Sequence, residues 1–283
     1  MARVLIVGCG DLGTAIALQL HQAQHEVIGV RISQQNLPHG MQTIQADVTQ
    51  ANTLTSLKPL NPAIIIYCVA ASAQTDENYC AHYVQGLKNV LATQANNTHL
   101  QHVFFVSSTR VYGQTHGQNT QTILDENVAA EPADFGGERL LEAENVLTNL
   151  PCQTTALRLS GIYGEGRLYL VNTAKDISRW PANNSWSNRI HRDDAARFIA
   201  FLVQKAIHQQ ALERCYIVTD DMPTLQYTVL TWLASQMDID VSRIQTPVTN
   251  GGKRLSNKRL RATGFQLQYP NYQIGYQKVL ETI

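Results

Sequence analysis

The sequence lacks the features that mark several large classes of protein. Its 283 residues carry 22 basic and 22 acidic side chains, a formal net charge of zero, so electrostatics gives no reason to expect a nucleic-acid partner or an anionic membrane surface. No apolar run reaches the roughly 18 residues of a transmembrane helix. The apolar N-terminal stretch is broken by three glycines and Asp11 before it completes a signal peptide. We therefore expect a soluble cytoplasmic protein.

The five cysteines lie far apart in the sequence. They form no Cys-x-x-Cys pair and no Cys/His spacing typical of metal ligands, so the sequence predicts neither a metal site nor a disulfide framework. Isolated thiols with apolar neighbours are typical of a reducing compartment, where they serve as small core residues.

The chain does contain short apolar runs that alternate with longer segments of helical period. Strands are expected at residues 3–7, 26–30, 43–46, 63–70, 102–107 and 154–160, and helices at 12–24, 76–95, 138–150 and 193–205. This rhythm predicts an α/β fold of the Rossmann type, a doubly wound parallel sheet with helices on both faces. We expect the core domain to span 1–163, with 188–220 returning to it. Residues 164–187 and 221–283 are expected to form a smaller C-terminal lobe.

The turn after the first expected strand carries the clearest functional signal. Gly8, Gly10 and Gly13 have the Gly-x-Gly-x-x-Gly spacing between a strand and a helix. In this motif the first glycine allows a tight turn, the second allows the backbone to approach a pyrophosphate closely, and the third allows the helix to pack tightly on the strand. The helix that starts near Asp11 offers backbone N–H groups and the positive end of its dipole to phosphates. The sequence therefore predicts a dinucleotide cofactor; the alternative is a glycine-rich turn without a ligand.

Three further residues bear on which dinucleotide is bound. Arg31 ends the second expected strand, where an NAD site usually carries a carboxylate for the ribose 2′-hydroxyl. A guanidinium there pairs with a 2′-phosphate, and Ser33 adds a donor, so we expect NADP in preference to NAD, with a solvated cation as the alternative reading of Arg31. Asp47 follows the third strand and is expected either to accept a hydrogen bond from the adenine amino group or to lie in a surface turn.

With these motifs in order, the chain resembles the extended short-chain dehydrogenase/reductases of the NAD(P)-dependent epimerase/dehydratase type. The segments YVQGLKNVLA (83–92), FFVSSTRVYG (104–113), RLSGIYGEGR (158–167) and NRIHRDDAARFI (188–199) are similar to family segments. The resemblance implies an oxidoreductase or isomerase that acts on a nucleotide sugar or a similar hydroxylated small molecule, with a homodimer as a common assembly. It also implies that these residues contact the cofactor: Gly8, Gly10, Asp11, Leu12, Gly13, Arg31, Ser33, Asp47, Val48, Val69, Ala70, Ala71 and Ser107.

The resemblance breaks at the family's catalytic pair. In the family, a Ser or Thr acts with a Tyr and with a Lys four residues after it, and the Tyr exchanges a proton with the substrate hydroxyl while nicotinamide exchanges a hydride. Ser108 matches the serine. The segment EPADFGGERLLEAE (131–144), however, places Phe135 and Arg139, or in a second register Gly136 and Leu140, where the Tyr and Lys belong. The usual proton relay is therefore absent.

Three residues are candidates to complete the site with Ser108. Tyr112 is a substitute phenol, Glu138 a substitute base and Arg139 a ligand for ribose hydroxyls. Packing is the alternative role for Tyr112, and a solvated partner of the helix dipole the alternative for Glu138. The sequence thus leaves two hypotheses: an enzyme with a non-standard base, or a sensor that binds NADP(H) without turnover.

Other motif residues are expected on the substrate side. Arg167 and Arg189 occupy places where arginines of related epimerases bind the substrate's diphosphate, a role that suits a bidentate guanidinium. His116 and His191 are the histidines nearest these motifs, and a structural role is expected for His191.

Overall fold

A computed structural model describes residues 1–113 and 122–283 of the chain; His116 lies outside the described residues. The chain divides into two compact units. Unit 1 contains residues 1–113, 130–158 and 195–216, and unit 2 contains residues 114–129, 159–194 and 217–283. Among the described residues, none of the helices is both long enough and apolar enough to cross a membrane.

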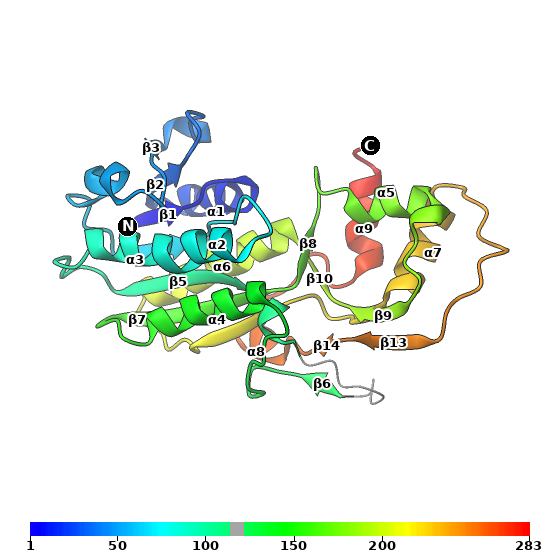
Figure 1. Cartoon of the computed structure of the whole chain (residues 1–283). Helices are drawn as coiled ribbons and strands as arrows, with labels where there is room; N and C mark the ends of the chain where they lie inside the picture. Colours follow the sequence, from blue (N-terminus) through cyan, green and yellow to red (C-terminus); the bar gives the residue numbers. More distant parts are fainter. Residues whose placement is uncertain (114–121) are drawn as a thin grey trace. The chain divides into compact units, whose positions relative to one another are not determined.

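A seven-stranded sheet forms the core of the fold, with the strand order β11-β7-β5-β4-β1-β2-β3 and helices on both of its sides (Figure 1). The pairs that join β3, β2, β1, β4 and β5 are all parallel. The predicted Rossmann-type α/β fold is therefore confirmed. The strands are β1 (Arg3–Val7), β2 (Glu26–Arg31), β3 (Gln42–Gln45), β4 (Ile64–Tyr67), β5 (His102–Ser108), β7 (Gln153–Leu159) and β11 (Cys215–Val218).

The apolar composition of the central strands explains their position. All four residues of β4 and four of the five residues of β1 are buried, as expected for parallel strands covered on both faces. The helices of this part are α1 (Asp11–Gln22), α2 (Asp76–Tyr79), α3 (Gly86–Thr93), α4 (Phe135–Leu147) and α6 (Arg192–Ile207). Between α2 and α3 the chain forms a π-helical segment, η3 (Cys80–Gln85), so the expected single helix 76–95 is divided into three parts.

Helix α4 begins three residues before the expected start at residue 138. The carboxylate of Asp134 accepts a hydrogen bond of 2.9 Å from the backbone N–H of Gly137, and an N-cap of this kind stabilises the first turn. Phe135 and Arg139 therefore lie one helical turn apart on the same helix.

Unit 2 is built from short strands around a second apolar core, which includes Val171, Leu230, Leu233 and Tyr276. Its small sheets have the strand orders β10-β8, β12-β9-β13 and β14-β6. The strands and α-helices that lie wholly in unit 2 are β6 (Ile123–Leu124), β8 (Gly161–Tyr163), α5 (Tyr169–Lys175), β9 (Asn184–Ser187), β10 (Arg189–His191), β12 (Thr224–Leu225), α7 (Gln226–Gln236), β13 (Thr249–Gly252), β14 (Arg254–Leu255), α8 (Lys258–Ala262) and α9 (Tyr272–Leu280).

Candidate functional site

The three glycines of the turn after β1 differ in why the chain needs them. Gly8 has φ +98°, and a Cβ there would lie 2.5 Å from the carbonyl oxygen of Cys68; a Cβ on Gly13 would lie 2.3 Å from the carbonyl oxygen of Gly8. Close packing of the chain on itself therefore requires both residues. Gly10 has φ −75°, and no atom of the described residues lies within 4 Å of where its Cβ would be. Nothing in the part of the chain that the structure describes requires a glycine at position 10.

Open space beside Gly10 lies at the start of α1. Gly10 is the N-cap residue of that helix and has no side chain to accept a hydrogen bond from the first turn, whose backbone N–H groups have no partners within the helix. Asp11 is exposed at this helix start, and Leu12 is buried. A pyrophosphate would find donors, a favourable dipole and room for close approach here, so these residues fit a dinucleotide.

Arg31 lies at the end of β2, in the strand next to β1. Its Nη2 donates a hydrogen bond of 2.9 Å to Gln35 Oε1, while its buried Nε has no hydrogen-bond partner among the described residues. Ser33 is exposed two residues later. An unpartnered guanidinium donor beside the dinucleotide fold suits a phosphate oxygen.

Asp47 and Val48 follow β3. Oδ1 of Asp47 accepts hydrogen bonds from the backbone N–H (2.9 Å) and the hydroxyl (2.7 Å) of Thr49, so this carboxylate stabilises the turn in which it lies. Val48 is buried, and its carbonyl accepts a hydrogen bond of 2.8 Å from Asn89.

The segment after β4 lies against the glycine turn through Cys68. Val69 and Ala71 are half-buried, and Ala70 is exposed. The backbone N–H of Ala71 donates a 3.4 Å hydrogen bond to the hydroxyl of Tyr83, which lies in the π-helical segment η3. Tyr83 opens the segment YVQGLKNVLA, but its contact with Ala71 could not be read from the sequence.

A buried polar network joins β5, α4 and β7. Glu144 accepts a hydrogen bond of 2.6 Å from the Ser107 hydroxyl and pairs with Arg158 at 2.7 Å, and Arg158 also donates to the Tyr112 hydroxyl at 2.5 Å. Burial opposes the charged form of Arg158, but the hydrogen bond and the charge of Glu144 leave its pKa raised. Tyr112 is fully buried. These contacts favour the packing role of Tyr112 and occupy the hydroxyl of Ser107.

The side chains that replace the family's Tyr and Lys have other partners. The ring of Phe135 lies edge-on to Tyr79, with centroids 5.4 Å apart, and under the guanidinium of Arg110 at 5.3 Å. Arg139 binds both carboxylate oxygens of Asp76, at 2.7 and 2.9 Å. These contacts stabilise α4 against α2 and involve no proton carrier at position 135.

The remaining candidates near α4 are Ser108 and Glu138. Ser108 is half-buried at the carboxyl end of β5, and its hydroxyl oxygen accepts a 3.2 Å hydrogen bond from the N–H of Arg110. Glu138 is exposed in the first turn of α4. The position of Glu138 suits a partner of the helix dipole.

Arg189 in unit 2 is almost completely buried. Its Nη2 donates a 2.6 Å hydrogen bond to Ser187 Oγ, and its Nε and Nη1 have no hydrogen-bond partner in the part of the chain that the structure describes. Asp220 also has an unpartnered buried oxygen, Oδ2, and burial raises the pKa of this carboxyl to about 7. Arg167 is half-buried, and its backbone N–H donates a hydrogen bond to Gly164. Unpartnered buried donors of this kind require a water or a ligand oxygen.

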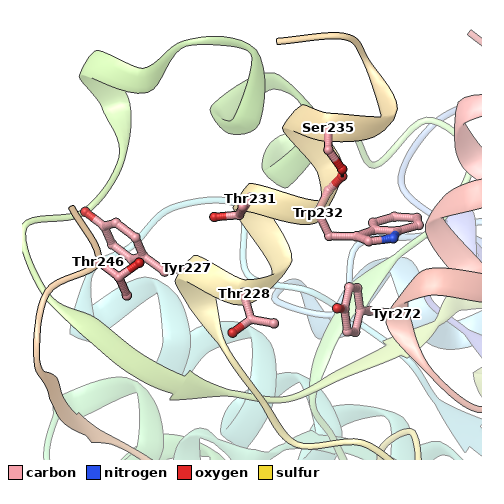
Figure 2. Close-up of a pocket in the computed structure, with 7 residues that line it drawn as sticks. All are labelled: Tyr227, Thr228, Thr231, Trp232, Ser235, Thr246 and Tyr272. Atoms are coloured by element: carbon pink, nitrogen blue, oxygen red, sulfur yellow. Dashed lines mark hydrogen bonds between the residues drawn. The ribbon is translucent and has the colours of Figure 1, made fainter. Parts of the chain in front are cut away.

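One cavity of about 460 Å³ lies on the surface of α7 in unit 2. Figure 2 shows Thr228, Thr231 and Ser235 along the helix, with Trp232 and Tyr272 at one side. None of the residues predicted from the sequence lines this cavity. Among the described residues, no group of three His, Cys, Asp or Glu side chains could hold a metal ion.

A family profile and a solved structure both match this chain over most of its length. A family profile described as the NAD dependent epimerase/dehydratase family matches residues 4–213. The structure of a Methylobacillus flagellatus protein, provisionally assigned as an NAD-dependent epimerase/dehydratase, is 47% identical, with 99% of this chain and 98% of that chain covered and a TM-score of 0.89. A search of curated proteins gave no match.

More distant structures share the fold. UDP-glucose 4-epimerase of Thermus thermophilus, in complex with NAD, is 16% identical over 99% of this chain and 98% of that chain, with a TM-score of 0.78. The enzyme WbmG of Bordetella bronchiseptica, in complex with NAD and UDP, is 14% identical over 99% and 94% of the two chains, with a TM-score of 0.77.

Proposed function

The chain belongs to the NAD-dependent epimerase/dehydratase family, and on that premise we propose that it binds NADP and acts on a hydroxylated small molecule such as a nucleotide sugar. The observation that best supports this proposal is the open space beside Gly10. Gly8 and Gly13 are required by the chain's own packing, but the space beside Gly10 is open. A glycine without a structural reason, at the N-terminus of a helix, is best explained by the close approach of a pyrophosphate.

Arg31 supports NADP over NAD. The Thermus and Bordetella structures hold NAD, so the proposal depends on this chain's own residues. A buried guanidinium nitrogen of Arg31 has no hydrogen-bond partner among the residues described, and a 2′-phosphate would provide one. Bound nicotinamide would supply or accept the hydride in the reaction, and Ser108 would hydrogen-bond a substrate oxygen.

On the substrate side, Arg189 supports a diphosphate or another anion as ligand. Two of its nitrogens are buried and unpartnered, and burial of a charged group without partners is costly. The UDP in the Bordetella structure is the basis for proposing a nucleotide sugar.

A second candidate function is an NADP(H)-binding sensor without turnover. It is favoured by the contacts of α4, where Phe135 carries no proton and Arg139 is paired with Asp76. The two functions share the cofactor and differ in turnover.

Titration with NADPH and NADH, followed through nicotinamide fluorescence, tests the binding. Gly10→Ala should cost about 0.5 kcal/mol of stability or less, yet weaken NADPH binding about tenfold or more because its methyl group occupies the space of the pyrophosphate. Gly8→Ala is the matched comparison and should destabilise the fold, since its φ is positive and its Cβ would meet Cys68. If wild type binds neither dinucleotide at millimolar concentration, or if Gly10→Ala binds as wild type does, the proposal is wrong.

Hydride exchange between NADP⁺ and a series of nucleotide sugars deuterated at their alcohol carbons, starting with UDP-glucose, then separates the two functions, because an alcohol carbon gives its hydride to the oxidised dinucleotide. Exchange with any of them supports the enzyme. Binding of NADPH without exchange supports the sensor.

A further inference from the structure

The carboxyl ends of β1 and β4 define where a ligand of this sheet would lie. The two strands are parallel neighbours, with Val7 opposite Tyr67. The chain runs from β1 outward to β2 and β3 and then returns to β4 on the other side of β1. In doubly wound sheets, ligands bind in the crevice at such a reversal of strand order. The turns that follow the two strands are in contact here, because Gly8 packs on the backbone of Cys68.

Tyr83 reaches this same edge of the sheet. Its hydroxyl accepts the hydrogen bond from the Ala71 N–H, three residues after Cys68. The ring is fixed by two aromatic neighbours: its centroid lies 5.2 Å from that of Tyr79 and 6.5 Å from that of Phe105, to which it is edge-on. It is half-buried. The π-helical segment that carries Tyr83 is of a kind often found at functional sites.

The hydroxyl of Tyr83 keeps its proton available. The bond from Ala71 uses a lone pair of the oxygen, and none of the described residues accepts a hydrogen bond from the phenolic O–H. The hydroxyl of the neighbouring Tyr79, in contrast, already uses its proton: it donates a hydrogen bond to Gln74 at 3.0 Å and accepts one from Arg110 at 2.8 Å. Burial raises the pKa of Tyr83, with a smaller opposing effect from the Ala71 N–H, so the side chain is a protonated phenol near neutral pH.

We propose that Tyr83 is the proton donor that replaces the missing Tyr-x-x-x-Lys pair in the reduction of a substrate carbonyl. As the carbonyl carbon gains a hydride from the reduced nicotinamide, the C=O π bond breaks and its electron pair moves to oxygen. The Tyr83 O–H bond breaks, its proton bonds to that oxygen, and the resulting phenolate regains a proton from water. The carbonyl is reduced to an alcohol and the dinucleotide is oxidised. In the reverse direction the phenolate accepts the proton.

The inference rests on the proposed function, and its first test needs no substrate. Fluorotyrosine is incorporated into the whole chain, and the Tyr83 resonance is assigned in the fluorine NMR spectrum by its loss in Tyr83→Phe. A phenol beside the nicotinamide should titrate about one pH unit lower with NADP⁺ than with NADPH, because the positive nicotinamide ring stabilises the phenolate. Equal midpoints with the two forms bound would overturn the proposal.

The second test separates binding from proton transfer. Tyr83→Phe should bind NADPH within about threefold of wild type and transfer hydride about 10²-fold to 10⁴-fold more slowly in the exchange assay. Tyr79→Phe is the matched control: it removes the phenol hydroxyl at the end of α2 but keeps the ring that packs on Tyr83, and it should retain hydride transfer. If Tyr83→Phe transfers hydride at the wild-type rate, Tyr83 is not the donor, whereas failure of wild type to bind NADPH would instead remove the proposed function.

Discussion

Arg31 determines, at the scale of one side chain, which dinucleotide we expect to bind. Arg31→Asp removes a donor for the 2′-phosphate and adds a carboxylate that accepts a hydrogen bond from the 2′-hydroxyl of NAD. The ratio of the NADH and NADPH dissociation constants should therefore change by about tenfold or more in favour of NADH, since a charged hydrogen bond contributes roughly 1.5–3 kcal/mol. Paired fluorescence titrations measure that ratio.

The same change of charge at an unrelated position is the control for Arg31. Arg243→Asp alters an exposed residue of unit 2 and should leave the ratio of dissociation constants unchanged. An unchanged ratio in Arg31→Asp would show that this guanidinium does not contact the 2′-phosphate.

Asp220 should make stability depend on pH. Burial raises its pKa from 3.8 to about 7, while the charge of Arg189 has a smaller, opposing effect. Between these values the folded chain holds a proton that the unfolded chain releases, so the free energy of unfolding falls as pH rises from about 4 to 7, by at most ~1.4 kcal/mol per pH unit. Asp220→Asn keeps a neutral side chain at every pH and should lose this dependence. Urea unfolding between about pH 5 and 8 measures the effect.

Asp221→Asn provides the control for Asp220. It makes the same substitution at the adjacent, exposed residue and should leave the pH dependence as in wild type. If Asp220→Asn and wild type lose stability equally as the pH rises, the carboxyl of Asp220 is not neutral in the folded protein.

At the scale of elements, the sequence was most informative where local pattern and burial agree. The strand at 3–7 was predicted with its observed bounds because its apolar run is buried along β1. The expected strand 63–70 is four residues in the structure, Ile64–Tyr67, because the chain leaves the sheet to lie against the glycine turn. The start of α4 was misplaced because the capping contact of Asp134 was not recognised.

The sequence predicted those parts of the candidate site that depend only on the spacing of residues along the chain. The glycine turn and the absent Tyr-x-x-x-Lys pair are both visible in sequence. Two contacts of the site are not visible in the sequence, because each joins residues of different elements. They are the hydrogen bond from Arg158 to Tyr112 and the hydrogen bond from Ala71 to Tyr83. The π-helical segment likewise interrupts a helix whose sequence pattern is continuous.

The network of Glu144 stabilises the packing of three elements, β5, α4 and β7. Glu144→Gln should lower the free energy of unfolding by roughly 3 kcal/mol, because it leaves the buried guanidinium of Arg158 without its counter-charge. Glu142→Gln makes the same change on the same helix, where the carboxylate pairs with Arg139 and both side chains are partly exposed. That variant should cost less than about 1 kcal/mol. Equal losses in urea unfolding would mean that the buried pair contributes no more than the exposed one.

At the scale of the whole molecule, the chain passes repeatedly between its two units. Unit 1 is assembled from three segments and unit 2 from three others. The boundary falls within three elements, β7, α6 and β11, whose ranges contain residues of both units. The sequence predicted that residues 188–220 return to the core domain, and this segment contains α6 and β11. The place of β11 beside β7 in the sheet was not predicted, because that pairing joins distant residues and periodicity does not reveal it.

This connectivity predicts one cooperative unfolding transition that a ligand of unit 1 shifts as a whole. NADPH at 100 times its dissociation constant should add about 2.7 kcal/mol to the stability of the folded chain and raise the Tm by roughly 5 °C or more. Calorimetry with increasing NADPH would show a single peak that moves upward. Gly10→Ala, with its weakened site, should show a much smaller shift at the same concentration. Two peaks, of which NADPH moves only one, would mean that the units unfold independently, because binding stabilises only the part that unfolds together with the site.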